Sequence, residues 1–177
     1  MSADSPLPVE RFETSLTALA VPVTRVEPSA FEETLRDVVL DVDAVVGTPL
    51  PFASVSLPGW VDDEPTPATL EAATTGVTAA SLGVADYGSV VLPGTPEGGE
   101  PVSLFQDLHV AVLRRSDLVG EMRTAIERLG PQLREGHSAI VATGPSATAD
   151  MGALVKGAHG PKDVHVLLLE DGGGDDE

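Results

Sequence analysis

Three nearly continuous apolar runs constrain what this chain can fold into. They span residues 108–113, 139–142 and 164–169, and each is short and almost free of charge. Such runs are typical of strands that are covered on both faces. Segments with helical spacing lie between them, so strands and helices alternate along the chain. We therefore predict an α/β fold with a mostly parallel sheet sandwiched by helices.

The first third of the chain predicts two helices and two strands. Four apolar residues recur at helical spacing in the first segment: Val9, Phe12, Leu16 and Leu19. We expect a helix there, a short strand over 21–26, and a second helix that opens with a capping box of Ser29 and Glu32. A strand at 44–46 precedes a proline-rich surface excursion over 49–67, which Thr66 and Pro67 close as the N-cap and first position of a short helix.

The remaining segments predict further strands and helices. Residues 77–93 predict two or three short strands that bend at Gly83 and Gly88. We expect Ser116 to cap a helix whose apolar face includes Val119, Met122, Ile126 and Leu129, and which stops at residues 130–131. The strand at 139–142 is expected to lead into a short helix, and 164–169 to form the last strand.

Length and charge limit the domain organisation and the partners. The 177 residues favour a single domain over 1–171, and the tail 172–177 contains only Gly and acidic residues, for which we expect disorder. Against 28 Asp and Glu stand 10 Lys and Arg, which gives a formal charge of −18. This charge argues against nucleic acids and anionic membranes as partners. We interpret it as adaptation to a salt-rich cytoplasm.

Several chemistries and locations are excluded or disfavoured by residue content. The chain has no cysteine, so it offers no disulfide, no thiolate nucleophile and no cysteine-ligated iron–sulfur or zinc site. The first residues lack the basic start and apolar stretch of a signal peptide. The longest uncharged run, 44–61, is broken by prolines and glycines. We expect a cytoplasmic protein that does not insert into a membrane.

The run 139–150 offers a candidate anion site. A buried strand is expected to stop at Gly144, after which Ser146 and Thr148 open a helix that includes Asp150. Ligands of open α/β sheets collect outside the carboxyl ends of the strands, and a helix N-terminus offers free N–H groups to a carboxylate or phosphate. The alternative is structural: Ser146 caps the helix and Asp150 interacts favourably with its dipole.

A second candidate is the loop before the last strand. His159, Gly160 and Lys162 lie on one tight turn, where the imidazole could act as an acid or base and the ammonium could orient an anion. The alternative is a hydrogen-bonded structural histidine. His109 and His165 lie in apolar strands and are interpreted as core or edge residues. No metal-ligand spacing recurs, so no metal site is predicted.

A third candidate is the segment 83–92, which carries Asp86, Tyr87 and Ser89 around a glycine. Asp86 could serve as an acid, a base or a hydrogen-bond anchor, with Ser89 beside it. The alternative is an ordinary hairpin turn. The basic pair Arg114 and Arg115 either binds an acidic substrate or neutralises nearby acids, and the acidic composition favours neutralisation.

Three segments together resemble the LUD (lactate utilisation) domain family: 85–91, 109–112 and 143–150, followed by the His-Gly-Pro loop at 159–161. The resemblance is strong over 76–169 and weaker over 21–73. It implies a fold similar to the NagB/RpiA/CoA transferase-like group and a role in oxidising L-lactate to pyruvate with two iron–sulfur partner proteins. Family members usually have Glu-Thr-Gly where this chain has residues 86–88, so Asp86 keeps the carboxylate on a shorter side chain.

The resulting hypothesis is a non-cluster component of a lactate or related hydroxy-acid oxidation system. A small anionic substrate would lie in a cleft between the Asp86 turn, the Ser146 loop and the His159 loop. Electrons would leave through the iron–sulfur proteins or a bound organic cofactor, whose identity the sequence leaves open. Two alternatives remain at this point: a stand-alone enzyme that binds a sugar phosphate or CoA ester in the same cleft, and a regulatory subunit.

Overall fold

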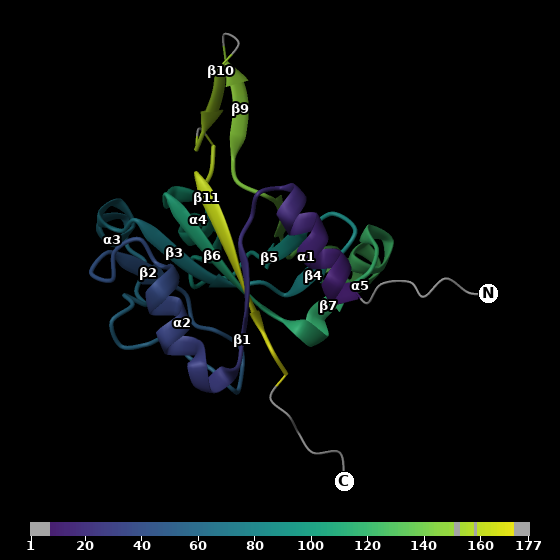
Figure 1. The fold of residues 1–177 in the computed structure, drawn as a ribbon, viewed down its shortest axis with the longest axis horizontal. Coiled ribbons are helices and arrows are strands. Elements are labelled where there is room, and N and C mark those ends of the chain that lie inside the picture. The colour runs from purple at the N-terminus through teal and green to yellow at the C-terminus, as the bar shows by residue number, and fades with distance from the viewer. Residues whose placement is uncertain (1–7, 151–152, 158, 172–177) are drawn as a thin grey trace, which may run out of the picture.

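A computed structural model describes residues 8–150, 153–157 and 159–171. Its centre is a five-stranded sheet in the order β1–β11–β6–β3–β2, and every neighbouring pair is parallel (Figure 1). In chain order these strands are β1 (Val23–Val26), β2 (Val45–Gly47), β3 (Thr75–Ala79), β6 (Leu108–Arg114) and β11 (Asp163–Leu169). The predicted α/β fold with a mostly parallel central sheet is therefore confirmed.

A second sheet was not anticipated. It has four strands in the order β7–β4–β5–β8, with β5 antiparallel to both of its neighbours. The strands are β4 (Leu82–Val84), β5 (Ser89–Pro93), β7 (Leu118–Val119) and β8 (Ala139–Thr143). The sequence predicted a buried strand at 139–142. The strand is present, but β8 lies at the end of this sheet and Val141 is 41% exposed, so the predicted burial is wrong.

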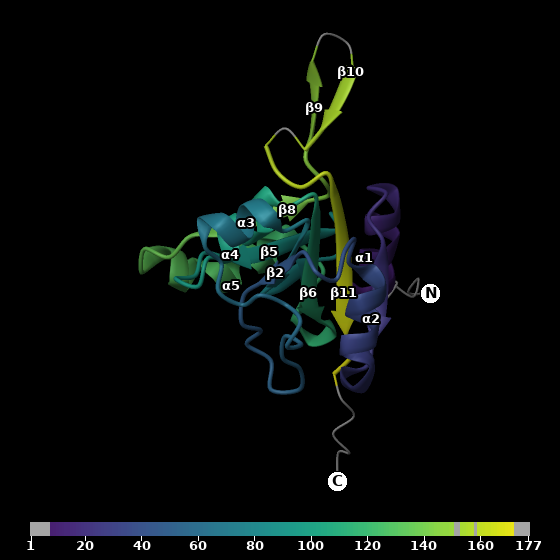
Figure 2. The same ribbon diagram turned by 90° about the vertical axis from the view of Figure 1, so that its left-hand side faces the viewer.

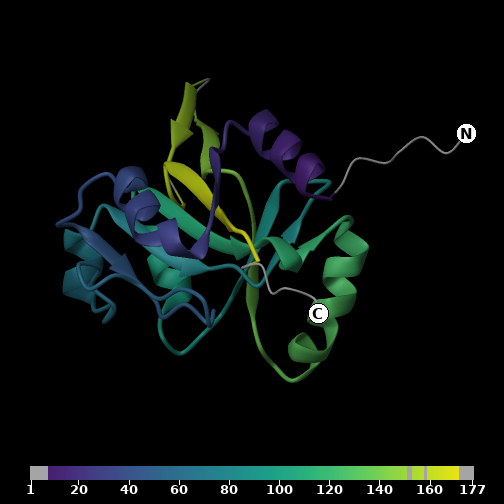
Figure 3. The ribbon, with the colours of Figure 1, turned by 60° about the horizontal axis from the view of Figure 1, so that its bottom comes forward.

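Three apolar cores hold the layers together. On one face of the parallel sheet, α2 (Phe31–Val38) and the loop around Phe52 cover Val110, Val112 and Leu167. On the other face, α1 (Pro8–Ala18) and strand β5 pack against the neighbouring positions of β6 and β11. The outer face of the second sheet is covered by α5 (Met122–Arg134), which Figure 3 shows on the far side of the molecule from α2.

Two short helices occupy the connections beside β3. Helix α3 (Pro67–Ala72) begins as predicted, because the Thr66 side chain accepts a hydrogen bond from the Thr69 N–H. Helix α4 (Gly99–Phe105) packs directly on the sheet at Gly76. A Cβ atom at Gly76 would lie 2.1 Å from the carbonyl oxygen of Val102, so only glycine permits this approach.

Three predicted helix boundaries are wrong. Ser29 lies in a 3₁₀ turn, η1 (Pro28–Ala30), and the cap of α2 is Ala30 without a side-chain bond, so the Ser29 and Glu32 capping box does not form. Ser116 likewise lies in a 3₁₀ turn, η2 (Arg115–Asp117), ahead of β7, and Glu121 precedes α5. Helix α5 continues through Pro131 to Arg134, so the predicted stop at residues 130–131 is wrong, although Pro131 has no N–H to donate to the carbonyl four residues before it. Ile126, predicted to face inward, is 49% exposed.

The segment predicted to be a short helix after residue 145 forms a hairpin. Strands β9 (Ala147–Asp150) and β10 (Ala153–Lys156) are antiparallel and project from the body of the molecule (Figure 2). Gly144 turns the chain at φ 73°, and the backbone of Ser146 then bonds to residues 157 and 161. These long-range bonds replace the local ones that a helix would need.

Within the described ranges, no helix has the length and apolar character needed to cross a bilayer. The tail 172–177, predicted to be disordered, lies outside the residues that the structure describes.

Candidate functional site

Two of the predicted site segments meet at the base of the hairpin. The Ser146 N–H donates to the Pro161 carbonyl at 2.9 Å, and the Gly157 N–H donates to the Ser146 carbonyl at 2.9 Å. The His159 N–H donates to Ser146 Oγ at 3.3 Å. Ser146 is therefore the residue that holds the 157–161 loop in place, and its hydroxyl is already engaged with that loop.

The glycines of these segments have conformational roles. Gly144 and Gly157 have φ values of 73° and 75°, which favour glycine over other residues. A Cβ atom at Gly160 would lie 3.2 Å from the Cβ of Ser146. Gly160 thus allows the two segments to pack closely, and Gly144 turns the chain into the hairpin.

The 157–162 loop lines a hollow of about 380 Å³. The lining residues come from the end of α4, the residues just before β6 and the loop itself: Leu104, Phe105, Gln106, Asp107, Gly157, His159, Gly160 and Lys162. Asp107 immediately precedes β6 and Lys162 immediately precedes β11. The hollow therefore lies at the amino end of the parallel sheet, whereas the sequence argument expected a ligand at the carboxyl ends.

The only two lysines of the chain flank this loop. Lys162 Nζ lies 2.8 Å from Asp107 Oδ1, and Lys156 Nζ lies 3.5 Å from Asp163 Oδ1. All four side chains are at least half exposed, so each pair contributes little to stability. The Lys162 ammonium can therefore exchange Asp107 for another carboxylate at low cost.

Gln106 is a feature of this hollow that the sequence analysis did not single out. Its side chain is buried, and Nε2 donates to the Leu70 carbonyl at 3.1 Å. Among the described residues, none donates to its Oε1 atom. No sequence signal points to it, because a glutamine between a helix and a strand is an ordinary residue there.

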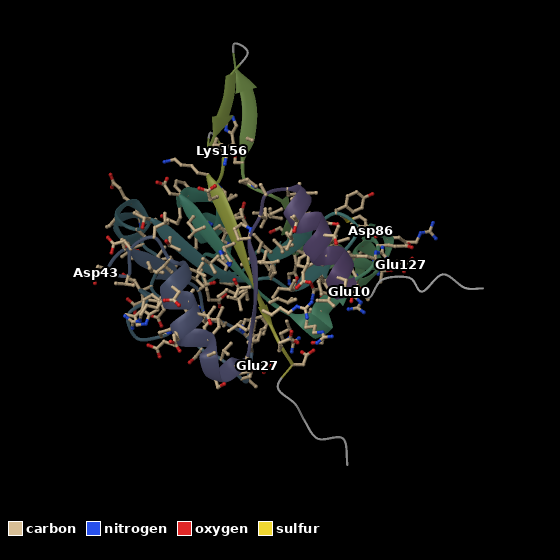
Figure 4. The ribbon with its side chains drawn as sticks, viewed as in Figure 1. Glu10, Glu27, Asp43, Asp86, Glu127 and Lys156 are labelled. Carbon is tan, nitrogen blue, oxygen red and sulfur yellow. The ribbon has the colours of Figure 1, made fainter. Side chains whose placement is uncertain are left out.

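Asp86 lies apart from this hollow. It sits in the turn between β4 and β5, pairs with Arg11 on α1, and lines a separate hollow with Glu10, Thr14 and Ser15. Figure 4 labels Asp86 beside α1 and Lys156 at the base of the hairpin. The predicted common cleft of Asp86, Ser146 and His159 is therefore wrong, and the hairpin turn is the interpretation that fits Asp86.

The other predicted anion-binding residues have different surroundings from those expected. Ser89 is fully buried, and its Oγ lies 2.7 Å from Thr143 Oγ1, a bond that joins β5 to β8. Thr148 and Asp150 lie on β9, and their side chains are outside what the structure describes. Because this segment is a strand, the predicted helix N-terminus does not exist.

Of the two histidines predicted to be core or edge residues, His109 lies in the core, whereas His165 is only partly buried on β11. His109 is fully buried, with Nε2 at 2.9 Å from Thr78 Oγ1, and burial lowers its pKa to about 4. His165 Nε2 lies 2.9 Å from Thr24 Oγ1, and burial also lowers its pKa. Both imidazoles therefore favour the neutral form.

The basic pair neutralises acids, as the sequence favoured. Arg114 pairs with Asp117 at 2.7 Å and Arg115 with Glu170 at 2.9 Å. The described part of the chain contains no group of three or more His, Asp or Glu side chains placed to hold a metal ion.

Comparison with known sequences identifies relatives of this chain. Residues 60–169 match the LUD domain. Lactate utilization protein C of Deinococcus radiodurans is 29% identical over 126 residues, which are 70% of this chain and 59% of that protein. Lactate utilization protein C of Bacillus velezensis is 33% identical over 106 residues, which are 57% of this chain and 44% of that protein. The chain thus aligns with only about half the length of these relatives.

A solved structure has the same fold. The crystal structure of a DUF162 family protein from Deinococcus radiodurans superposes with a TM-score of 0.71 at 20% sequence identity. The superposition covers 93% of this chain and 99% of that one. At this identity the likeness concerns the fold.

Proposed function

Because the chain belongs to the LUD domain family, we propose that it is the non-cluster component of a system that oxidises L-lactate, or a related hydroxy acid, to pyruvate. Its relatives from Deinococcus radiodurans and Bacillus velezensis carry the name lactate utilization protein C, which supports a role in lactate utilisation. The charge of −18 supports a salt-rich cytoplasm as its location.

The observation that carries the proposal is the placement of both lysines beside the His159 loop. In a chain with 28 acidic and 10 basic residues, a site for an anion needs a local cation. Lys162 lines a hollow of about 380 Å³ together with His159 and the Gly157 and Gly160 backbone. We assign the lactate carboxylate to the Lys162 ammonium, where a charge-assisted hydrogen bond would replace the exposed pair with Asp107.

The oxidation itself requires partners. Lactate becomes pyruvate when its C2–H and O–H bonds break, which releases two electrons and two protons. We assign removal of the hydroxyl proton to His159, which is exposed on the loop. The chain has no cysteine to ligate a cluster, so we assign the two electrons and the proton from C2 to the iron–sulfur partner proteins. Asp86 is outside the proposed hollow.

Titration with L-lactate, followed by NMR on the isotopically labelled chain, tests the binding step. Lactate should shift the amide signals of Gly157, Gly160 and Lys162, and Lys162→Gln should weaken binding about tenfold or more, because a hydrogen bond to a charged group is worth roughly 1.5–3 kcal/mol. The matched control is Arg36→Gln, which removes the same charge from an exposed helical pair on α2.

Two outcomes would contradict the proposal. If both variants weakened lactate binding equally, Lys162 would act only through the net charge of the protein and not as a ligand of the carboxylate. Binding of a sugar phosphate or CoA ester in this hollow, without binding of lactate, would favour the stand-alone enzyme instead.

A further inference from the structure

A second hollow lies at the carboxyl ends of β2 and β3, where ligands of parallel sheets usually bind. Its volume is about 290 Å³. Its polar side chains are Thr48, Thr78, Thr95 and Glu97, and its walls are aliphatic side chains and prolines that include Leu50 and Leu92. The hollow shares no lining residue with the one beside Lys162.

Thr48 gives this hollow a hydroxyl that is available to a ligand. The residue directly follows β2, and its N–H donates to the Val77 carbonyl at 3.1 Å, which fixes its backbone. The residue is only 5% exposed, yet it lines the hollow. Within the ranges that the structure describes, the Thr48 hydroxyl makes no hydrogen bond. The only buried side-chain atom without a partner among the described residues is Gln106 Oε1, so the Thr48 hydroxyl is open to the hollow, where it can donate one hydrogen bond to a ligand and accept two.

Thr78 supplies a second hydroxyl with a fixed position. Its Oγ1 lies 2.9 Å from Nε2 of His109, which is 1% exposed and lies behind it in the sheet. A hydroxyl can donate one hydrogen bond and accept two. Whichever tautomer His109 adopts, the Thr78 oxygen keeps bonding capacity for a ligand. His109 therefore acts as a positioning residue.

Charge decides which ligand fits. Glu97 is the only ionisable side chain among the residues that line the hollow. An anionic ligand would meet the Glu97 carboxylate with no cation to offset it, so anions are disfavoured. A carboxylate accepts hydrogen bonds, and two adjacent hydroxyl groups can donate to its two oxygens. The aliphatic walls at Leu50 and Leu92 suit the apolar face of a ring.

We infer that this hollow binds the cis-diol of an uncharged sugar ring through Glu97, Thr48 and Thr78. The ring is either a free sugar or the ribose of a nucleoside, since both present the same hydroxyl pair. The Glu97 carboxylate accepts from the diol, and the two threonine hydroxyls bond to the remaining ring oxygens. This inference does not depend on the proposed role in lactate oxidation.

NMR titration of the labelled chain with D-ribose, 2-deoxy-D-ribose and adenosine tests the inference. D-ribose and adenosine should shift the Thr48 and Thr78 amides and the ¹⁵N resonance of His109 Nε2, with Kd values on the order of 1 mM, because the site makes few hydrogen bonds. The deoxy sugar lacks the 2-hydroxyl group and should bind more weakly. Tighter binding of adenosine than of ribose would identify the ring as part of a nucleoside.

Two variants make the test specific. Thr48→Val keeps the shape of the side chain and removes its hydroxyl, so it should weaken ribose binding roughly 2- to 10-fold. Glu97→Gln should also weaken it, whereas Glu100→Gln is the matched control, because Glu100 lies nearby on α4 but does not line the hollow. Unchanged amide spectra away from the site would show that each variant folds.

The inference is overturned if neither ribose nor adenosine shifts Thr48, Thr78 and His109, or if the shifts map to the Lys162 loop. It is also overturned if L-lactate perturbs Thr48 and Thr78 as strongly as ribose does. Loss of lactate binding at Lys162 would leave these results unaffected, so failure of the proposed function is distinguishable from failure of this inference.

Discussion

The imidazole of His109 on β6 and the hydroxyl of Thr78 on β3 lie 2.9 Å apart in the interior of the protein. This bond satisfies one nitrogen of a histidine that is almost completely buried. A positive charge on the ring would have to be desolvated, and burial therefore lowers the pKa of His109 from 6.5 to about 4.

The depressed pKa predicts a loss of stability in acid. Below pH 6.5 the unfolded chain binds a proton at His109, whereas the folded chain binds it only near pH 4. The stability that comes with the neutral His109 ring is fully present above pH 6.5. It is lost as the pH falls to 4, which lowers the free energy of unfolding by an amount on the order of 3 kcal/mol. Denaturant unfolding across this pH range measures it.

The variant His109→Gln isolates this effect from the titration of the acidic residues. Glutamine does not titrate, so the difference in free energy of unfolding between wild type and variant should change by that amount between pH 6.5 and 4. Two curves that run parallel over this range would contradict the assignment.

The close approach of α4 to the sheet predicts a severe effect of Gly76→Ala. The new Cβ atom would lie 2.1 Å from the Val102 carbonyl oxygen, and the helix backbone would have to move. We expect a loss of at least roughly 2 kcal/mol in the free energy of unfolding. The control is Gly59→Ala, where no atom lies within 4 Å of the added Cβ and the expected change is below about 1 kcal/mol. Similar losses in both variants would refute this explanation.

The ion pair between Lys162 and Asp107 predicts that removing the Asp107 charge raises the affinity for L-lactate. Asp107 occupies the ammonium that is assigned to the lactate carboxylate, and both side chains are about half exposed. Asp107→Asn should raise the affinity for L-lactate by roughly 2- to 5-fold, because the competing pair is worth about 0–1 kcal/mol. Calorimetric titration measures this change. Asp43→Asn, an exposed site near β2 (Figure 4), is the control for net charge, and an equal gain there would remove the specific role of Asp107.

The charge of −18 predicts a stability that depends on salt. The Debye length is ~3 Å at 1 M salt and ~10 Å at 0.1 M, so repulsion among surface acids is screened only at high salt. The melting temperature should rise from low to multimolar KCl. A melting temperature that stays constant across this series would contradict adaptation to a salt-rich cytoplasm.

The central sheet could be predicted because two of its strands are recognisable from their own apolar sequence. Residues 108–113 and 164–169 are apolar except for one histidine each, and this pattern is typical of strands covered on both faces. The hairpin at 147–156 could not be predicted in the same way. Its strands are short, and its geometry depends on bonds from Ser146 to residues 157 and 161, which a local pattern does not contain.

Only part of the candidate site could be predicted from the sequence, namely the proximity of the Ser146 and His159 segments. The Ser146 and His159 segments meet because they are the two ends of one hairpin, so their proximity follows from chain connectivity. Asp86 was expected beside them, but its position depends on where α1 packs, and Arg11 on that helix pairs with it. Pairing between distant elements is set by tertiary packing, which residue spacing does not encode.

Lactate-dependent dye reduction tests the central claim most directly. Proteins that co-purify with the chain at native salt would be separated into cluster-bearing partners and this chain, and each would be assayed alone and together. We predict that the chain alone is inert, that the partners alone are nearly inert, and that the mixture oxidises L-lactate to pyruvate, with activity reduced about tenfold or more by Lys162→Gln. Reduction of the dye by the purified chain alone, or full activity of the partners without it, would contradict the account.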